Sequence, residues 1–339
     1  MTSGFPSSSV LFCDAYDRLW RSYFSPSSNP FFKQCLSQLA SQLHLSRCAS
    51  TFSRYDSHWL RFKAWCSRAG VSCLPAQPLH VAMFLACTSS YALSLNLTFA
   101  PVKLASAAVS TAHSLAGLPD VTSQPIVANM RSSARRFLVS GQLNQKEPLS
   151  LGLCLTAAGH LLRSDSLTAL RTATYIMLSF AGFLRFADAR SLFCDEIKFY
   201  PSHMELFLEK RKNNQFRRGE VICIARGSSF ACPVLLTHQL LSRSRSHGCH
   251  VPLFPWSYSV TRQTVLSALA AAAQVPFSEF SRAFGLHSFR SGGASFVAQS
   301  GVPDHIFQAH GAWRSPQSMQ RYISRSLHNQ LLPTQVMCY

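Results

Sequence analysis

A helix that begins at His287 constrains the fold more than any other stretch of the chain. The pattern from 287 to 300 predicts a helix, and His287 and Arg290 lie three residues apart on one face of it. Both side chains are therefore expected to point at one small anion, such as a phosphate. Gly292 and Gly293 are poor helix formers that allow another backbone to approach closely. We expect this helix to be pressed against DNA or against a partner helix.

Turn signals after this helix predict two more short helices. Gly301 stops the first helix, and Pro303 suits the first turn of a second. Ser315 followed by Pro316 is a cap followed by a proline at the first helical position, which starts a third helix. Tyr322 lies less than about two turns into that helix, where it is held in position and need not be buried.

The charge balance of the chain indicates a polyanionic partner. The 339 residues are 47% hydrophobic, which is enough to bury a full core and suggests two domains. The net charge of +18 arises because 32 Lys and Arg face only 14 Asp and Glu. We expect phosphate neutralisation and a marked dependence of binding on salt. The alternative is a basic protein without a nucleic-acid function.

Several other classes of protein are not favoured. The 12 cysteines include no C-x-x-C pair, which is typical of a reduced intracellular protein. We interpret the group His247, Cys249 and His250 as a polar loop rather than a zinc site, because a second pair of ligands is missing. The apolar run 173–184 is shorter than a membrane span of roughly 18 to 20 residues, and the N-terminus has no basic region typical of a signal peptide. We therefore predict a protein that binds no metal or cofactor and does not associate with a membrane.

The N-terminal half is expected to be an arm followed by a helical domain. Residues 1–30 are rich in Ser and Pro and predict a flexible arm, whereas 31–141 has a helical pattern. An aromatic stripe at helical spacing consists of Phe52, Tyr55, Trp59, Phe62 and Trp65. We interpret it as a packed helix face, with base stacking by one exposed member as the alternative.

Basic residues in this half are candidates for DNA contacts. Further helices are predicted near 78–89, 99–116 and 122–140. On or near them lie Lys103, Arg131, Arg135 and Arg136. As a group they are expected to contact phosphates, although each alone could be an ordinary surface charge. The polar stretch 142–148 ends in proline and is expected to link two domains.

The second domain, 149–339, is predicted to be mainly α with a small antiparallel β-sheet. Helices are expected near 150–164 and 166–183, and Arg185 follows the second of these, where it needs a partner or a phosphate. Alternation from 204 to 208 and an apolar run at 221–225 predict a hairpin with a basic tip. Two more helices are expected near residues 235 to 245 and 259 to 274.

Two blocks of residues resemble the tyrosine recombinase, or phage integrase, family. One family block reads His-x-x-Arg, then His or Trp, then a nucleophilic tyrosine nine residues later; here Trp313 and Tyr322 are nine apart. The other reads Gly-x-x-Arg-x-x-Glu-x-x-x-Leu, and this chain has Gly182, Arg185, Asp188 and Leu192, with Asp in the Glu position. The resemblance implies an N-terminal helical core-binding domain plus a tyrosine-recombinase catalytic domain.

A third segment resembles recombinases of eukaryotic mobile elements. Residues 212–219 are similar to the Lys-Thr-Asp-Gln-Tyr-Arg-x-Gly turn of DIRS-like, Ngaro-like and Crypton enzymes, which implies a nuclear protein. Lys212 takes the place of the catalytic lysine, with Lys210 as the alternative. The hairpin residues expected to contact DNA are Lys210, Arg211, Arg217 and Arg218.

The resemblance implies strand cleavage without a metal. The residues assigned to catalysis are Arg185, Lys212, His287, Arg290, Trp313 and Tyr322, with Asp188 in a supporting position. Tyr322 attacks phosphorus and forms a 3′-phosphotyrosyl link, while a lysine protonates the leaving 5′ oxygen. The arginines hold the phosphate oxygens, because a guanidinium group matches two oxygens and stays charged.

The expected partners are double-stranded DNA and further copies of the chain, as a dimer or tetramer on DNA. A domesticated DNA-binding protein without catalysis is the first alternative. A type IB topoisomerase, which shares the chemistry, is the second, but its long linker and cap are missing from the sequence.

Overall fold

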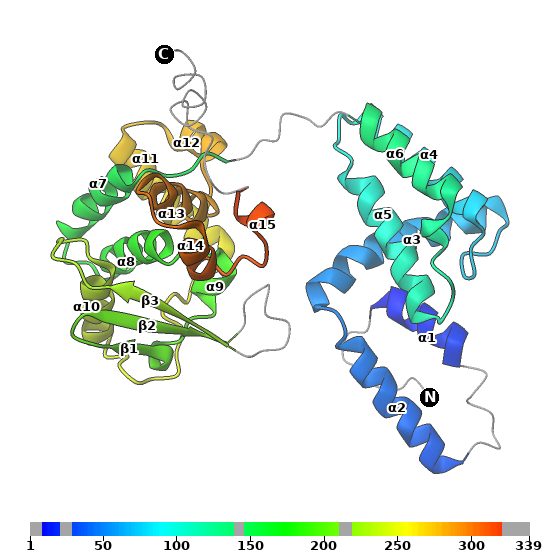
Figure 1. The fold of residues 1–339 in the computed structure, drawn as a ribbon, viewed down its shortest axis with the longest axis horizontal. Coiled ribbons are helices and arrows are strands. Elements are labelled where there is room, and N and C mark those ends of the chain that lie inside the picture. The colour runs from blue at the N-terminus through cyan, green and yellow to red at the C-terminus, as the bar shows by residue number, and fades with distance from the viewer. Residues whose placement is uncertain (1–8, 21–28, 139–145, 210–218, 321–339) are drawn as a thin grey trace. The chain divides into compact units, whose positions relative to one another are not determined.

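The structure is a computed structural model that describes residues 9–20, 29–138, 146–209 and 219–320. The chain divides into two compact units, Met1–Asn144 and Gln145–Tyr339, drawn in Figure 1. This division falls within the stretch 142–148, where the linker was predicted.

All the described elements of the N-terminal unit are helical. They are α1 (Val10–Trp20), α2 (Pro30–His44), α3 (Ala49–Ala69), α4 (Pro78–Ser94), α5 (Ala100–Leu115), the short 3₁₀ helix η2 (Val121–Ser123) and α6 (Pro125–Phe137). Proline stands at the start of α2, α4, α5 and α6, where its fixed φ favours the helix and its missing N–H has no intrahelical partner to lose.

Helix α1 lies inside the segment 1–30 that was expected to form a flexible arm, and it corrects that expectation. Its Leu11 is fully buried in the core of the unit, and the Leu11 backbone N–H donates to Asp56 of α3 over 2.9 Å. Asp14 of α1 accepts a hydrogen bond of 2.7 Å from the indole of Trp59. The Ser- and Pro-rich composition conceals a short helix that depends on its contacts with α3 and α5.

The aromatic stripe of α3 packs into the core. Phe52, Trp59 and Phe62 are buried, and Tyr55 and Trp65 pack against the same cluster as half-buried residues. The structure therefore supports the packing interpretation of the stripe over base stacking.

The C-terminal unit surrounds one buried helix. Its elements are α7 (Leu151–Leu162), α8 (Leu167–Ala181), α9 (Phe186–Arg190), the 3₁₀ helix η3 (Cys194–Glu196), β1 (Ile197–Phe199), β2 (His203–Leu208), β3 (Glu220–Ala225), α10 (Pro233–Ser244), α11 (Tyr258–Ala273), α12 (Phe277–Ala283), α13 (Ser288–Gln299), α14 (Asp304–His310) and α15 (Pro316–Gln320). Helix α8 contacts α7, α10, α11 and α13, and α13 lies beside α14 (Figure 1). None of the described helices combines the length and apolar character needed to cross a membrane.

A three-stranded antiparallel sheet, in the order β1-β2-β3, packs one face on this core. Leu206 of β2 pairs with Ile222 of β3, and both are buried. Alternate residues of β2 and β3 face outward, as a half-buried antiparallel sheet requires. Strand β1 was not predicted, because three residues are too few to show a period of two. The mainly helical fold with a small antiparallel sheet confirms the predicted fold class.

Two glycines let α13 lie directly on neighbouring backbone. A Cβ atom added to Gly292 would lie 2.2 Å from the carbonyl oxygen of Leu149, and one added to Gly293 would lie 2.3 Å from that of Phe180. The close approach expected from these glycines is therefore to segments of the same chain.

Replacing Gly293 by Ala should lower the free energy of unfolding by about 1 to 3 kcal/mol, because backbone must move to admit the methyl group. Gly152→Ala in α7 is the matched control, since a Cβ atom there has no neighbour within 4 Å. That control should be neutral or stabilising by up to about 1 kcal/mol. Urea unfolding of both full-length variants measures the difference, and equal stabilities would contradict the packing argument.

Candidate active site

Arg290 is a fully buried cation at the centre of the candidate site. Its side chain is 0% exposed. Nη1 donates to the carbonyl oxygen of Phe183 over 2.6 Å, and Nη2 donates to that of Gly311 over 2.5 Å. The guanidinium carbon also lies 4.2 Å from the centre of the Trp313 ring, within the range of a cation–π contact. Arg290 therefore joins the connection after α8 to the turn after α14.

Local backbone geometry creates the two acceptors. Phe183 has a φ of 48°, so the chain turns sharply between α8 and α9 through a left-handed residue. At the other acceptor, a Cβ atom on Gly311 would lie 1.9 Å from the ring of Trp313. Only glycine allows this tryptophan to fold back over the turn. Ala312, with a φ of 50°, completes the reversal.

Arg185 stands just beyond this connection and is placed differently from Arg290. Its side chain is 15% exposed, and its Nη1 lies 3.7 Å from the buried carboxylate of Asp188. Among the described residues, this buried Nη1 has no hydrogen-bond partner. Asp188 also accepts a hydrogen bond of 3.1 Å from the backbone N–H of Arg185, which caps α9. One carboxylate thus orients both the turn and the guanidinium group, and a donor is left for a phosphate oxygen.

His287 and Arg290 have different exposures, although three residues separate them. His287 is the exposed residue before α13, whereas Arg290 is inside the first turn of that helix and buried. The structure therefore does not place both side chains on one accessible face.

The sequence pattern missed two residues that shape this site. The Nε2 atom of His310 lies 2.8 Å from the carbonyl oxygen of Ala181, and its ring packs edge to face on Phe183 at 4.7 Å. Phe183 and Trp313 belong to one small apolar cluster with Met319 of α15. The order His310, Gly311, Trp313 in the sequence could have identified His310. Nothing in the sequence indicates the left-handed backbone of Phe183, since non-glycine residues seldom adopt that conformation.

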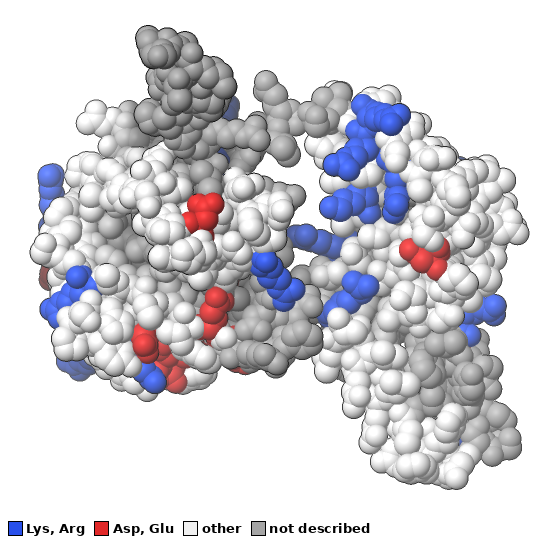
Figure 2. Space-filling view, viewed as in Figure 1, with Lys and Arg blue, Asp and Glu red and all other residues white. Residues whose placement is uncertain are grey.

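The remaining site residues lie outside the described residues or in the other unit. The site residues that the structure does not describe are Lys210, Arg211, Lys212, Arg217, Arg218 and Tyr322. In the N-terminal unit, Lys103, Arg135 and Arg136 are exposed, while Arg131 is half-buried and donates to Ser106 over 3.2 Å. Figure 2 shows Lys and Arg side chains gathered on one face of that unit, over α5 and α6.

Arg290→Lys should destabilise the chain by about 2 to 4 kcal/mol, because one ammonium group cannot reach both carbonyls and a buried unpaired acceptor costs about 1 to 3 kcal/mol. Arg185→Lys should destabilise the chain less than Arg290→Lys, because Arg185 bridges no pair of backbone carbonyls and a lysine keeps a positive charge near Asp188. Urea unfolding compares the two variants. Equal effects would mean that Arg290 does not hold the two segments together.

The chain is similar to known recombinases in sequence and in fold. No protein-family model matches the chain. A protein of Selenomonas ruminantium described as an integrase/recombinase xerD homolog is 25% identical over 295 residues, which is 84% of each chain.

Among solved structures, the XerH site-specific recombinase in a post-cleavage complex with palindromic difH substrate superposes with a TM-score of 0.63. It has 12% identity and covers 97% of this chain and 96% of its own. The Tn1549 transposon integrase in complex with transposon right end DNA gives a TM-score of 0.52 and 10% identity, covering 96% and 98%. The chain has the fold of these recombinases, and its similarity to the xerD homolog supports the tyrosine recombinase/integrase family.

Proposed function

We propose that the chain is a site-specific recombinase that cleaves and rejoins double-stranded DNA through a 3′-phosphotyrosyl link. One observation carries the proposal: Arg290 ties the connection that leads to Arg185 to the turn that leads to Trp313. Two separate sequence blocks are joined by one buried cation. The third element, Tyr322, follows Trp313 by nine residues.

In the proposed step, the hydroxyl oxygen of Tyr322 attacks phosphorus while the bond from phosphorus to the 5′ oxygen breaks. The tyrosine proton passes toward His287, and Lys212 or Lys210 protonates the leaving 5′ oxygen. The phosphodiester is exchanged for a phosphotyrosyl ester, so the reverse attack by a 5′ hydroxyl rejoins DNA without another energy source. No metal ion enters this scheme.

The two arginines differ in which of their N–H donors are already engaged by the protein. Arg185 presents a buried N–H, steadied by Asp188, that lacks a hydrogen-bond partner among the described residues. Two donors of Arg290 are engaged by backbone carbonyls. We therefore assign the first phosphate contact to Arg185. Arg290 would contribute its positive charge from behind, held by the two carbonyls.

The basic face of α5 and α6 is the proposed contact for DNA backbone, and the chain is proposed to act as a dimer or tetramer on DNA. The turn at 212–219 favours a eukaryotic mobile element, active in the nucleus, as the source of the substrate ends. A non-catalytic DNA-binding protein is the alternative. The Nη1 donor of Arg185 argues against it, because a buried N–H without a hydrogen-bond partner among the described residues destabilises a fold that does not use it.

Tyr322→Phe should abolish a covalent protein–DNA adduct while leaving DNA binding nearly intact, because only the nucleophilic oxygen is removed. Tyr91→Phe, which alters an exposed tyrosine in α4, should still form it. Incubation with candidate element ends in EDTA at low salt, followed by a denaturing gel, detects the adduct. An adduct that persists in Tyr322→Phe would refute the assignment, as would one that needs Mg²⁺.

Arg185→Lys should slow cleavage at least about a hundredfold, because a lysine cannot offer two aligned donors to the phosphate. The unfolding measurement on the same variant separates this effect from loss of fold. Cleavage at the parental rate would place the phosphate elsewhere.

A further inference from the structure

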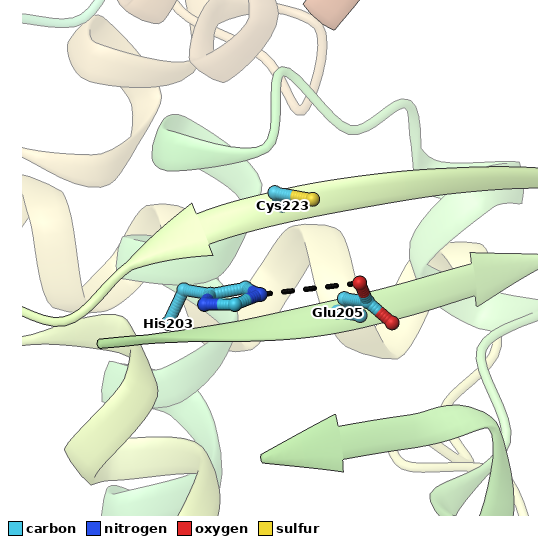
Figure 3. Close-up of side chains that lie close together, drawn as sticks. All are labelled: His203, Glu205 and Cys223. Carbon is cyan, nitrogen blue, oxygen red and sulfur yellow. Dashed lines mark ion pairs between the residues drawn. The ribbon is translucent and has the colours of Figure 1, made fainter. Parts of the chain in front are cut away.

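Three metal-binding side chains meet on the outer face of the sheet, in the part that the structure describes. His203 and Glu205 lie two residues apart on the same face of β2, and Cys223 lies opposite Glu205 on β3. One ligand atom from each lies within 4.8 Å of the others, and Nε2 of His203 is 3.9 Å from a carboxylate oxygen of Glu205. Figure 3 shows the three side chains gathered over the two strands.

Neighbouring side chains orient the histidine and the carboxylate. The Oγ atom of Ser202 lies 3.0 Å from Nδ1 of His203, and the Tyr200 ring stacks on the imidazole at 4.6 Å. If Nδ1–H donates to Ser202, then Nε2 carries the lone pair, and Nε2 is the nitrogen that faces Glu205. Tyr200 also donates its hydroxyl to the other oxygen of Glu205 over 3.2 Å. Supporting hydrogen bonds of this kind are typical of metal ligands.

The ligand set selects the metal. Thiolate and imidazole favour zinc over magnesium or calcium, which prefer oxygen ligands throughout. Zinc is tetrahedral, with bonds of about 2.0 to 2.3 Å, so three protein ligands leave one position for water. We propose that His203, Glu205 and Cys223 form a zinc site on the outer face of the sheet, separate from the candidate active site.

The proposed site joins the two strands of the hairpin near one end. His203 pairs with Ala225 at one end of the hairpin, and Leu208 pairs with Glu220 at the other. Zinc would cross-link β2 to β3 at the end remote from Leu208, and its fourth position would stay open to water.

Two competing arrangements are less favourable. Lys198 faces Glu205 from β1, but among the ion pairs of the described strands Glu205 is matched with His203 instead. The loop group His247, Cys249 and His250 does not converge, because Nδ1 of His250 lies 3.0 Å from Asp195 and the Cys249 thiol is directed at backbone carbonyls.

The experiment titrates the reduced, chelator-treated full-length protein with Co²⁺ and then displaces the cobalt with Zn²⁺. A thiolate-to-cobalt absorption band should appear in the parent protein and disappear in Cys223→Ser, whose zinc affinity should fall at least about tenfold. Cys249→Ser, another exposed cysteine, should keep both the band and the affinity.

Ser202→Ala should weaken binding by about tenfold without removing the thiolate band, because it disturbs only the histidine that it supports. Circular dichroism of each variant checks that the fold is retained. Absence of the band in the parent protein, or a band that survives Cys223→Ser or vanishes in Cys249→Ser, would overturn the proposal. DNA cleavage is not the readout, so this result is independent of the proposed recombinase activity.

Discussion

Burial of the Arg290 guanidinium is the constraint on which the C-terminal unit depends. A cation removed from water strongly destabilises a fold unless its donors are matched, and this group donates to two backbone carbonyls. Both carbonyls belong to turns, at Phe183 and Gly311, and the face of Trp313 adds a cation–π contact. The requirement therefore fixes two turns that are distant in sequence, and these turns carry the residues assigned to catalysis.

Glycine makes the arrangement sterically feasible. Gly293 brings α13 onto the carbonyl of Phe180, close to the turn that accepts the first Arg290 hydrogen bond. Gly311 leaves room for Trp313 to cover the second. A methyl group at either position would push away one wall of the site. Packing of backbone on backbone, more than side-chain volume, thus sets the distance between the two sequence blocks.

A mechanism without a metal requires charges that are already in place when the phosphate arrives. The structure holds one arginine in a rigid backbone frame and leaves the other, Arg185, with a donor directed by Asp188. Charged groups that are held in place before the phosphate arrives limit reorganisation during cleavage. The sheet packs its apolar inner face on the core, and its outer face carries the residues of the proposed zinc site, His203, Glu205 and Cys223.

Sequence patterns alone predicted the helices with strong caps, the hairpin of β2 and β3, and the three blocks that resemble recombinases. Local signals suffice there, because proline, glycine and side-chain periodicity act within a few residues. Long-range contacts in the folded chain were needed to show that Arg290 is buried while His287 is exposed, that α1 packs in the core, and that Cys223 faces Glu205. Each of these depends on segments far apart in the chain, since burial, strand register and the left-handed turn at Phe183 are set by long-range packing that no local pattern encodes.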